Sequence, residues 1–142
     1  EPLAPVRAIL WAESVELIAE NPVFGAHPGQ FQERLAEEYN DDRFYRLYVV
    51  PFSPNPHNLW LVTWVEWGLL TLIGLIGLLV AFVRTVWQRR SRWMLVPTAM
   101  MAAILVHGLV DVPVIKNDLA ILFMLTLALT LLPEQPKRRA RT

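Results

Sequence analysis

The sequence contains no cysteine, so disulfide bonds and thiol catalysis are excluded. It has no phosphate-binding glycine loop, no Gly-x-Ser-x-Gly nucleophile motif and no basic stripe with aromatics suited to nucleic acid. Three histidines are present, but none has a close ligand spacing such as His-x3-His. We therefore expect no metal, no cofactor and no nucleic-acid partner.

The formal net charge of zero hides an uneven distribution of charge along the chain. Residues 1–58 hold nine carboxylates against four arginines, whereas residues 59–142 hold four carboxylates against nine basic side chains. Basic clusters beside membrane spans stay in the cytoplasm. The clusters at residues 84–92 and 137–141 therefore predict the cytoplasmic side, and the acidic half then lies on the extracytoplasmic side.

Long apolar runs dominate the second half of the chain. The first, residues 59–83, has 25 residues and would be roughly 37 Å long as a helix, enough to cross a bilayer. We expect further spans at about 93–112 and 115–132, the last with a buried or interfacial lead-in. The predicted fold is all-α: a fragment of a polytopic integral membrane protein, with three transmembrane helices in residues 59–142 and a cytoplasmic C-terminal tail.

Residues 1–58 are predicted to form a partly helical extracytoplasmic loop. One helix is expected over residues 7–20, ended by Asn21-Pro22, and a second over residues 30–39. The first helix would turn three glutamates to water: Glu13, Glu16 and Glu20. Residues 43–52 could be extended or lie on the membrane interface. The chain opens without an initiator Met or a leader, so we expect the C-terminal part of a longer protein.

His57 stands directly before the first predicted span, and histidine is the side chain best suited to move a proton near neutral pH. An interfacial histidine that caps a helix would give the same pattern, and Asn58 is a natural N-cap. Glu66 lies inside the predicted span, where an ionisable group indicates function. A protonated or hydrogen-bonded structural glutamate is the alternative.

His107 and Asp111 are four residues apart and share a helix face near the outer end of the second predicted span. The carboxylate could orient the imidazole, although a buried polar pair that locks two helices explains the spacing more simply. The guanidinium of Arg7 could bind two phosphate oxygens, or it could be an ordinary surface arginine. The topology puts His57, His107 and Asp111 at one membrane face.

Three ordered motifs carry a family resemblance. The first is Arg7-x3-Trp11 followed by residues 21–25 (Asn-Pro-Val-Phe-Gly), and the second is His57-Asn58, nine residues and Gly68. The third is residues 107–113, His-Gly-Leu-Val-Asp-Val-Pro. In this order they resemble the long periplasmic loop, the His-[Asn/Ser/Gln]-x9-Gly signature and the stretch before the last span of the bacterial O-antigen ligase and polymerase superfamily.

The resemblance implies a metal-independent glycosyltransferase of the bacterial inner membrane. It would move a glycan from an undecaprenyl-pyrophosphate carrier to a hydroxyl of a lipid A core sugar at the periplasmic face. His57 would be the general base and Arg7 would bind the pyrophosphate. Supporting roles would fall to five further residues: Asn58, Glu66, Gly68, His107 and Asp111. Three spans enclose too little space for a long lipid donor, so residues 1–142 alone would be inactive.

Other functions remain open from the sequence. A polymerase that extends the glycan on its carrier, or a protein O-oligosaccharyltransferase, would keep the same site with a different acceptor. A transporter component could use Glu66, His107 and Asp111 as an intramembrane polar path. An inactive remnant is a further alternative.

Overall fold

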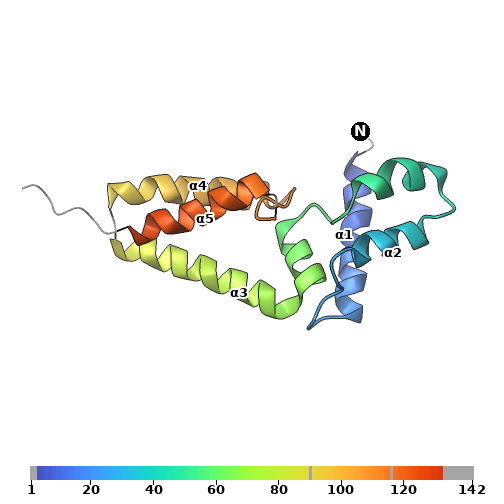
Figure 1. Cartoon of the computed structure of the whole chain (residues 1–142), viewed down its shortest axis with the longest axis horizontal. Helices are drawn as coiled ribbons and strands as arrows, with labels where there is room; N and C mark the ends of the chain where they lie inside the picture. Colours follow the sequence, from blue (N-terminus) through green and yellow to red (C-terminus); the bar gives the residue numbers. More distant parts are fainter. Residues whose placement is uncertain (1–2, 90, 116, 133–142) are drawn as a thin grey trace, which may run out of the picture.

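The computed structural model describes residues 3–89, 91–115 and 117–132, and all regular structure in these ranges is helical, as predicted. Figure 1 shows three helices side by side in an elongated bundle: α3 (Leu59–Arg89), α4 (Leu95–His107) and α5 (Asn117–Leu131). Two further helices, α1 (Leu3–Glu20) and α2 (Gln30–Glu38), lie beyond one end of the bundle. The predicted tail at residues 137–142 lies outside the described residues.

The N-terminal unit (residues 3–67) has its own hydrophobic core. Side chains from α1, α2 and the start of α3 meet there, and the most buried are Leu10, Leu17, Phe31, Leu35 and Val65. Each buried side chain of this size contributes about 1.5–3 kcal/mol relative to exposure. Both predicted helices are confirmed, although α1 begins at Leu3 rather than Arg7, and α2 ends at Glu38.

Glu13 is the exception to the predicted pattern. Helical periodicity turns it to water, but it is only 8% exposed, and its Oε1 accepts a hydrogen bond from the Tyr39 hydroxyl at 3.2 Å. Burial raises the pKa of the Glu13 carboxyl above its ordinary 4.5, although the hydrogen bond from Tyr39 opposes the shift. Burial and then the charge of Glu13 raise the pKa of Tyr39 to about 12. The prediction is wrong because periodicity within α1 cannot reveal a partner from another helix.

Residues 43–52 are helical, so the extended alternative is wrong. The Asp42 side chain caps the N-terminus of this segment. Its Oδ1 accepts hydrogen bonds from the backbone N–H groups of Phe44 at 2.8 Å and Tyr45 at 3.2 Å. A π-helical turn, η1 (Tyr45–Val49), and a 3-10 turn, η2 (Val50–Phe52), follow. The interfacial alternative stays a prediction.

Helix α3 bends sharply at Gly68, whose φ of 78° and ψ of 179° lie outside the helical region (Figure 1). The bend divides α3 into a first limb, residues 59–67, and a second limb, residues 69–89. Residues 59–83 are helical as expected, but the bend interrupts the single helix on which the expected length was based. Because only the second limb runs along the bundle, the first limb belongs to the N-terminal unit.

Gly25 packs against the bend. A Cβ on Gly25 would lie 2.7 Å from the Gly68 nitrogen, and a Cβ on Gly68 would collide with the Val23 carbonyl oxygen. Both glycines have positive φ, 73° and 78°. Backbone hydrogen bonds from Ala26 N to Val65 O and from Leu69 N to Val23 O close the contact. Two backbones can approach this closely only where neither residue carries a side chain.

Helix α3 is long and apolar enough to cross a membrane by length and composition. Its second limb of 21 residues would be about 31 Å long, close to the thickness of a bilayer hydrocarbon core. The other apolar helices of the described chain, Arg92–His107 and Leu119–Leu131, are shorter. The arrangement of three spans therefore stays a prediction. Four buried side chains hold the bundle together: Phe82, Met101, Ile104 and Phe123.

We predict that Glu13→Gln removes a pH dependence of stability. The raised pKa means that the protonated carboxyl stabilises the fold fully below pH about 4.5, and that this contribution is lost as pH rises through the folded pKa. The thermal midpoint of the purified intact protein should therefore fall less between pH 4.5 and 7.5 in the Gln variant. Glu37→Gln, at an exposed position of α2, is the control. Equal pH profiles for the parent and Glu13→Gln would contradict the prediction.

We predict that Gly68→Ala separates the first limb from the Gly25 loop. A positive φ at a residue with a side chain costs about 1–3 kcal/mol, and the overlap with Val23 adds to it. The thermal midpoint of the intact protein should therefore fall. Gly74→Ala is the matched control, since a Cβ there meets nothing within 4 Å. A parent-like midpoint for Gly68→Ala would show that the bend does not need glycine.

Candidate active site

His57 lies where the N-terminal unit joins the bundle, in an uncommon backbone conformation. Its φ is 48°, the one positive φ of a non-glycine residue in the described ranges. The side chain of Asn55 holds this conformation, because its Oδ1 accepts a hydrogen bond from His57 N at 3.0 Å. Such strain costs on the order of 1–3 kcal/mol and is concentrated at functional sites.

Asn58 fixes the start of α3, as its predicted role of N-cap requires. Its Oδ1 accepts hydrogen bonds from the backbone N–H groups of Trp60 and Leu61 at 3.0 and 3.1 Å. Its Nδ2 donates to the Leu109 carbonyl at 3.1 Å, and Leu59 N donates to the Gly108 carbonyl at 2.7 Å. The first turn of α3 is therefore attached to the turn that follows α4.

This attachment brings three of the predicted residues together. Asp111 lies between two imidazoles: its Oδ1 is 3.7 Å from His57 Nδ1, and its Oδ2 is 3.4 Å from His107 Nε2. The carboxylate also accepts a hydrogen bond from Val112 N at 2.9 Å, which fixes its orientation. The ion contact of His57 is made by Nδ1, which is the ring nitrogen nearer to Asp111.

Trp11 attaches α1 to the same junction. Its indole Nε1 donates a hydrogen bond to the Pro56 carbonyl at 3.1 Å, across 45 residues of sequence. Arg7 is one helical turn before Trp11 and therefore lies on the same side of α1. This bond explains the Arg7-x3-Trp11 spacing, since the tryptophan holds the helix at the residue that precedes His57.

Arg7 and His57 line one pocket, which the sequence could not establish. The pocket has a volume of about 280 Å³ and lies between α1, the η1–η2 segment and His57. Its remaining lining residues are Val6, Leu10, Phe44, Tyr48, Val49, Phe52 and Ser53. No salt bridge holds Arg7 within the described ranges, so its charge is free to bind an anion.

Glu66 and Gly68 are not part of this pocket. Glu66 is half-buried on the first limb of α3, eight residues or about 12 Å along the helix from Asn58. Gly68 acts through the bend rather than through a ligand. Among the described residues, no group of three or more His, Cys, Asp or Glu side chains is arranged to hold a metal ion.

The sequence reasoning missed the aromatic wall of the pocket. Phe44, Tyr48 and Phe52 recur at intervals of four, which is the spacing of one face of a helix. That spacing was the available signal, but a segment that could equally be extended hides it. Ser53, which is buried beside them, had no signal.

A family model described as O-antigen ligase matches residues 2–76, just over half of the 142 residues. The chain belongs to the O-antigen ligase family. No curated protein and no solved structure matches it. The predicted resemblance to the O-antigen ligase and polymerase superfamily is thus confirmed.

Membership of the O-antigen ligase family implies glycosyltransferase-like enzymes that are membrane-associated and act on lipid-linked glycans. The matched region contains Arg7, His57, Asn58, Glu66 and Gly68. It ends well before residue 107, so the association of Asp111 and His107 with the site rests on structural contacts: Asp111 contacts His57, and His107 contacts Asp111.

We predict that Asn58→Ala lowers stability by about 0.5–2 kcal/mol, the usual effect of removing an N-cap side chain. The same change breaks the bond to Leu109. Asn58→Ser keeps a capping hydroxyl but is too short to donate to that carbonyl, so its loss should be smaller. The thermal midpoint of the purified intact protein measures both changes. Midpoints that fall equally for Ala and Ser would show that the Leu109 bond, rather than the cap, fixes the start of α3.

Proposed function

We propose that the protein is a membrane glycosyltransferase of ligase type. It transfers a glycan from undecaprenyl pyrophosphate to a hydroxyl of a lipid A core sugar at the periplasmic face of the inner membrane. The observation that carries this proposal is the shared pocket of Arg7 and His57, with Asp111 beside the imidazole. A cation for a phosphate group and a base for a hydroxyl are the two groups that such a transfer needs.

In the proposed reaction the acceptor oxygen attacks the anomeric carbon of the donor. The new bond from carbon to the acceptor oxygen forms as the bond from carbon to the pyrophosphate oxygen breaks. His57 takes the proton of the acceptor hydroxyl, and undecaprenyl pyrophosphate leaves with the electron pair. Arg7 stabilises the negative charge that develops on the leaving group, so the proposed step requires no metal or cofactor.

The remaining residues are proposed to act on these two. Asp111 orients the imidazole of His57 and stabilises it when protonated, and His107 holds the other carboxylate oxygen. Asn58 supports the geometry through the start of α3. Glu66, on the first limb, and Gly68, at its end, would contribute through the position of this limb, which begins two residues after His57.

The orientation follows from charge. The acidic N-terminal unit would be periplasmic and the basic residues at 84–92 cytoplasmic. The lipid tail of the donor would then lie in the bilayer, and its pyrophosphate would reach the pocket at the outer membrane face. This arrangement agrees with the position of α1, which contributes Arg7 to the pocket and lies beyond the end of the bundle (Figure 1).

A polymerase or a protein oligosaccharyltransferase of the superfamily would use the same pocket with a different acceptor. A transporter finds less support. Its polar path would run through Glu66, His107 and Asp111, whereas the pocket that holds both a cation and an imidazole is lined by Arg7 and His57 and not by Glu66.

We predict that the intact protein restores O-antigen on lipopolysaccharide in a ligase-deficient strain. His57→Ala and Arg7→Ala should each abolish restoration at equal expression, since a general base alone contributes about 10²–10⁴-fold. Arg34→Ala, whose cation is paired with Glu20 on the N-terminal unit, is the control and should restore like the parent. A well-expressed parent that fails to restore would indicate another acceptor, and a fully active His57→Ala would remove the assigned base.

A further inference from the structure

Three aromatic side chains form one wall of the pocket that Arg7 and His57 share. Phe44, Tyr48 and Phe52 line it, and they are 50%, 65% and 71% exposed. Large aromatic side chains in a folded unit normally bury most of their surface. The N-terminal unit has a buried hydrophobic core, yet these three rings remain exposed beside Arg7.

Phe44 and Tyr48 belong to a series of ring contacts. Tyr39 stacks on Tyr45 at a centroid distance of 4.8 Å, and Tyr45 meets Phe44 edge-to-face at 5.7 Å. Phe44 in turn lies 5.7 Å from Tyr48. The series begins at the buried hydrogen bond between Tyr39 and Glu13. Two of the three wall rings, Phe44 and Tyr48, are therefore supported by aromatic neighbours of the N-terminal unit.

The backbone beneath the wall is also fixed. Val49 is buried, and Gln32 Nε2 of α2 donates a hydrogen bond to the Val50 carbonyl at 2.9 Å. Phe44 precedes the π-helical turn η1, Tyr48 lies within it and Phe52 ends η2, and all three line the pocket. Such turns are rare and are often found at functional sites.

The chemistry of the wall suits a sugar ring. One face of a pyranose presents C–H groups, which are apolar and slightly positive, and the face of an aromatic ring carries the negative part of its quadrupole. Ligand pockets combine such apolar walls with a few polar groups that fix orientation. We propose that Phe44, Tyr48 and Phe52 form an aromatic platform on which a sugar ring of the lipid-linked glycan stacks while Arg7 holds the pyrophosphate.

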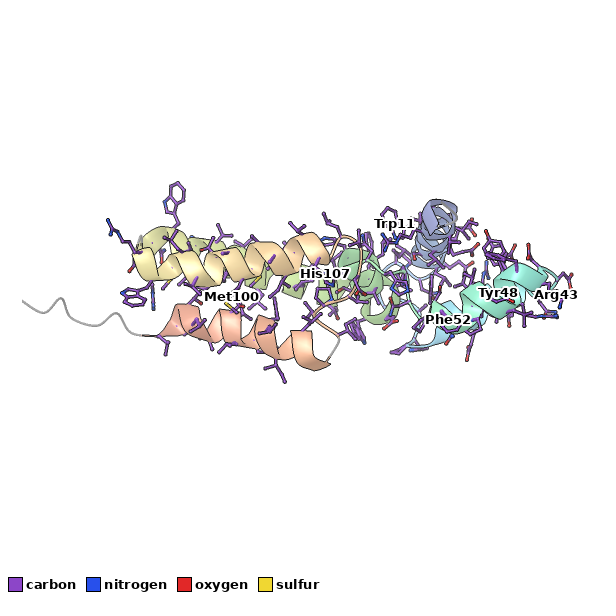
Figure 2. The ribbon with its side chains drawn as sticks, turned by 90° about the horizontal axis from the view of Figure 1, so that it is seen from above. Trp11, Arg43, Tyr48, Phe52, Met100 and His107 are labelled. Carbon is purple, nitrogen blue, oxygen red and sulfur yellow. The ribbon has the colours of Figure 1, made fainter. Side chains whose placement is uncertain are left out.

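The platform extends from the bundle in the direction in which the glycan of the donor would extend from the membrane. Figure 2 shows Phe52, Tyr48 and Arg43 following one another along the molecule, away from His107 and the bundle. A donor whose lipid lies in the bilayer extends its glycan away from the membrane. This inference rests on the proposed function, and it adds a subsite that selects the glycan rather than the lipid.

Two lipids separate the platform from the site of transfer. Undecaprenyl pyrophosphate without sugar probes Arg7 and the lipid alone, and the glycan-bearing undecaprenyl lipid from the expressing cells probes both. The purified intact protein is titrated with each, as parent and as Tyr48→Ala, Phe52→Ala and Tyr48→Phe. Leu47→Ala is the matched control, because Leu47 is 46% exposed on the same turn but does not line the pocket.

The parent should bind the glycan-bearing lipid more tightly than the bare lipid. Tyr48→Ala and Phe52→Ala should each weaken binding of the glycan-bearing lipid by roughly tenfold, as expected for removal of an aromatic contact, and leave binding of the bare lipid unchanged. Tyr48→Phe and Leu47→Ala should behave like the parent. In transfer assays the two Ala variants should raise the KM for the donor and keep most of kcat.

Several results would overturn the inference. Equal weakening for both lipids would make the wall a contact for lipid or membrane rather than for sugar. Parent-like binding by both Ala variants would show that the rings do not touch the glycan. A parent that gains nothing from the glycan would remove the subsite but leave the transfer reaction standing, whereas a parent that binds neither lipid would overturn the proposed function as well.

Discussion

The close approach of two glycines determines how the parts of this protein meet. Gly25 and Gly68 bring two backbones within a distance that no side chain allows, and both adopt a positive φ. The contact turns the first limb of α3 out of the bundle and into the core of the N-terminal unit. Because of that change of direction, the first residues of α3 lie against the turn that follows α4. His57, which precedes α3, therefore lies where the N-terminal unit, α3 and the end of α4 meet.

The site draws its chemical groups from separate parts of the chain. The unpaired cation comes from α1, the imidazole from the residue before α3, and the carboxylate from the turn after α4. Two hydrogen bonds to backbone carbonyls hold these parts in register, from Trp11 to Pro56 and from Asn58 to Leu109. The positions of the reactive groups therefore depend on long-range contacts made by residues that do no chemistry themselves.

Much of the helical content could be predicted from the sequence, because periodicity and proline positions are local signals. The apolar faces of α1 and α2 and the capping role of Asn58 are of this kind. Glu13 and the segment over residues 43–52 were not predictable in the same way. The environment of Glu13 depends on Tyr39, which comes from the end of α2, and the helical form of the segment depends on the Asp42 cap and on packing against α2.

The same distinction between local signals and long-range contacts separates the predictable from the unpredictable residues of the candidate site. His57, His107 and Asp111 could be grouped from the predicted topology, since helix ends at one membrane face must lie near each other. Whether Arg7 reaches His57 could not be predicted, because the path of the intervening loop is set by tertiary contacts such as the Trp11 bond. The aromatic wall was hidden for that reason too, and so was the bend at Gly68, where a glycine alone does not reveal a change of direction.

The shared use of α3 has a consequence for how the protein is made. Val65 completes the core of the N-terminal unit, and the last hydrogen bond of the glycine contact is donated by Leu69. The unit lacks part of these contacts until the ribosome has synthesised the residues beyond the bend. Final folding of the N-terminal unit must therefore wait for the first residue of the second limb of α3, and a chain that ends at the bend keeps Val65 but lacks the hydrogen bond that Leu69 donates to Val23.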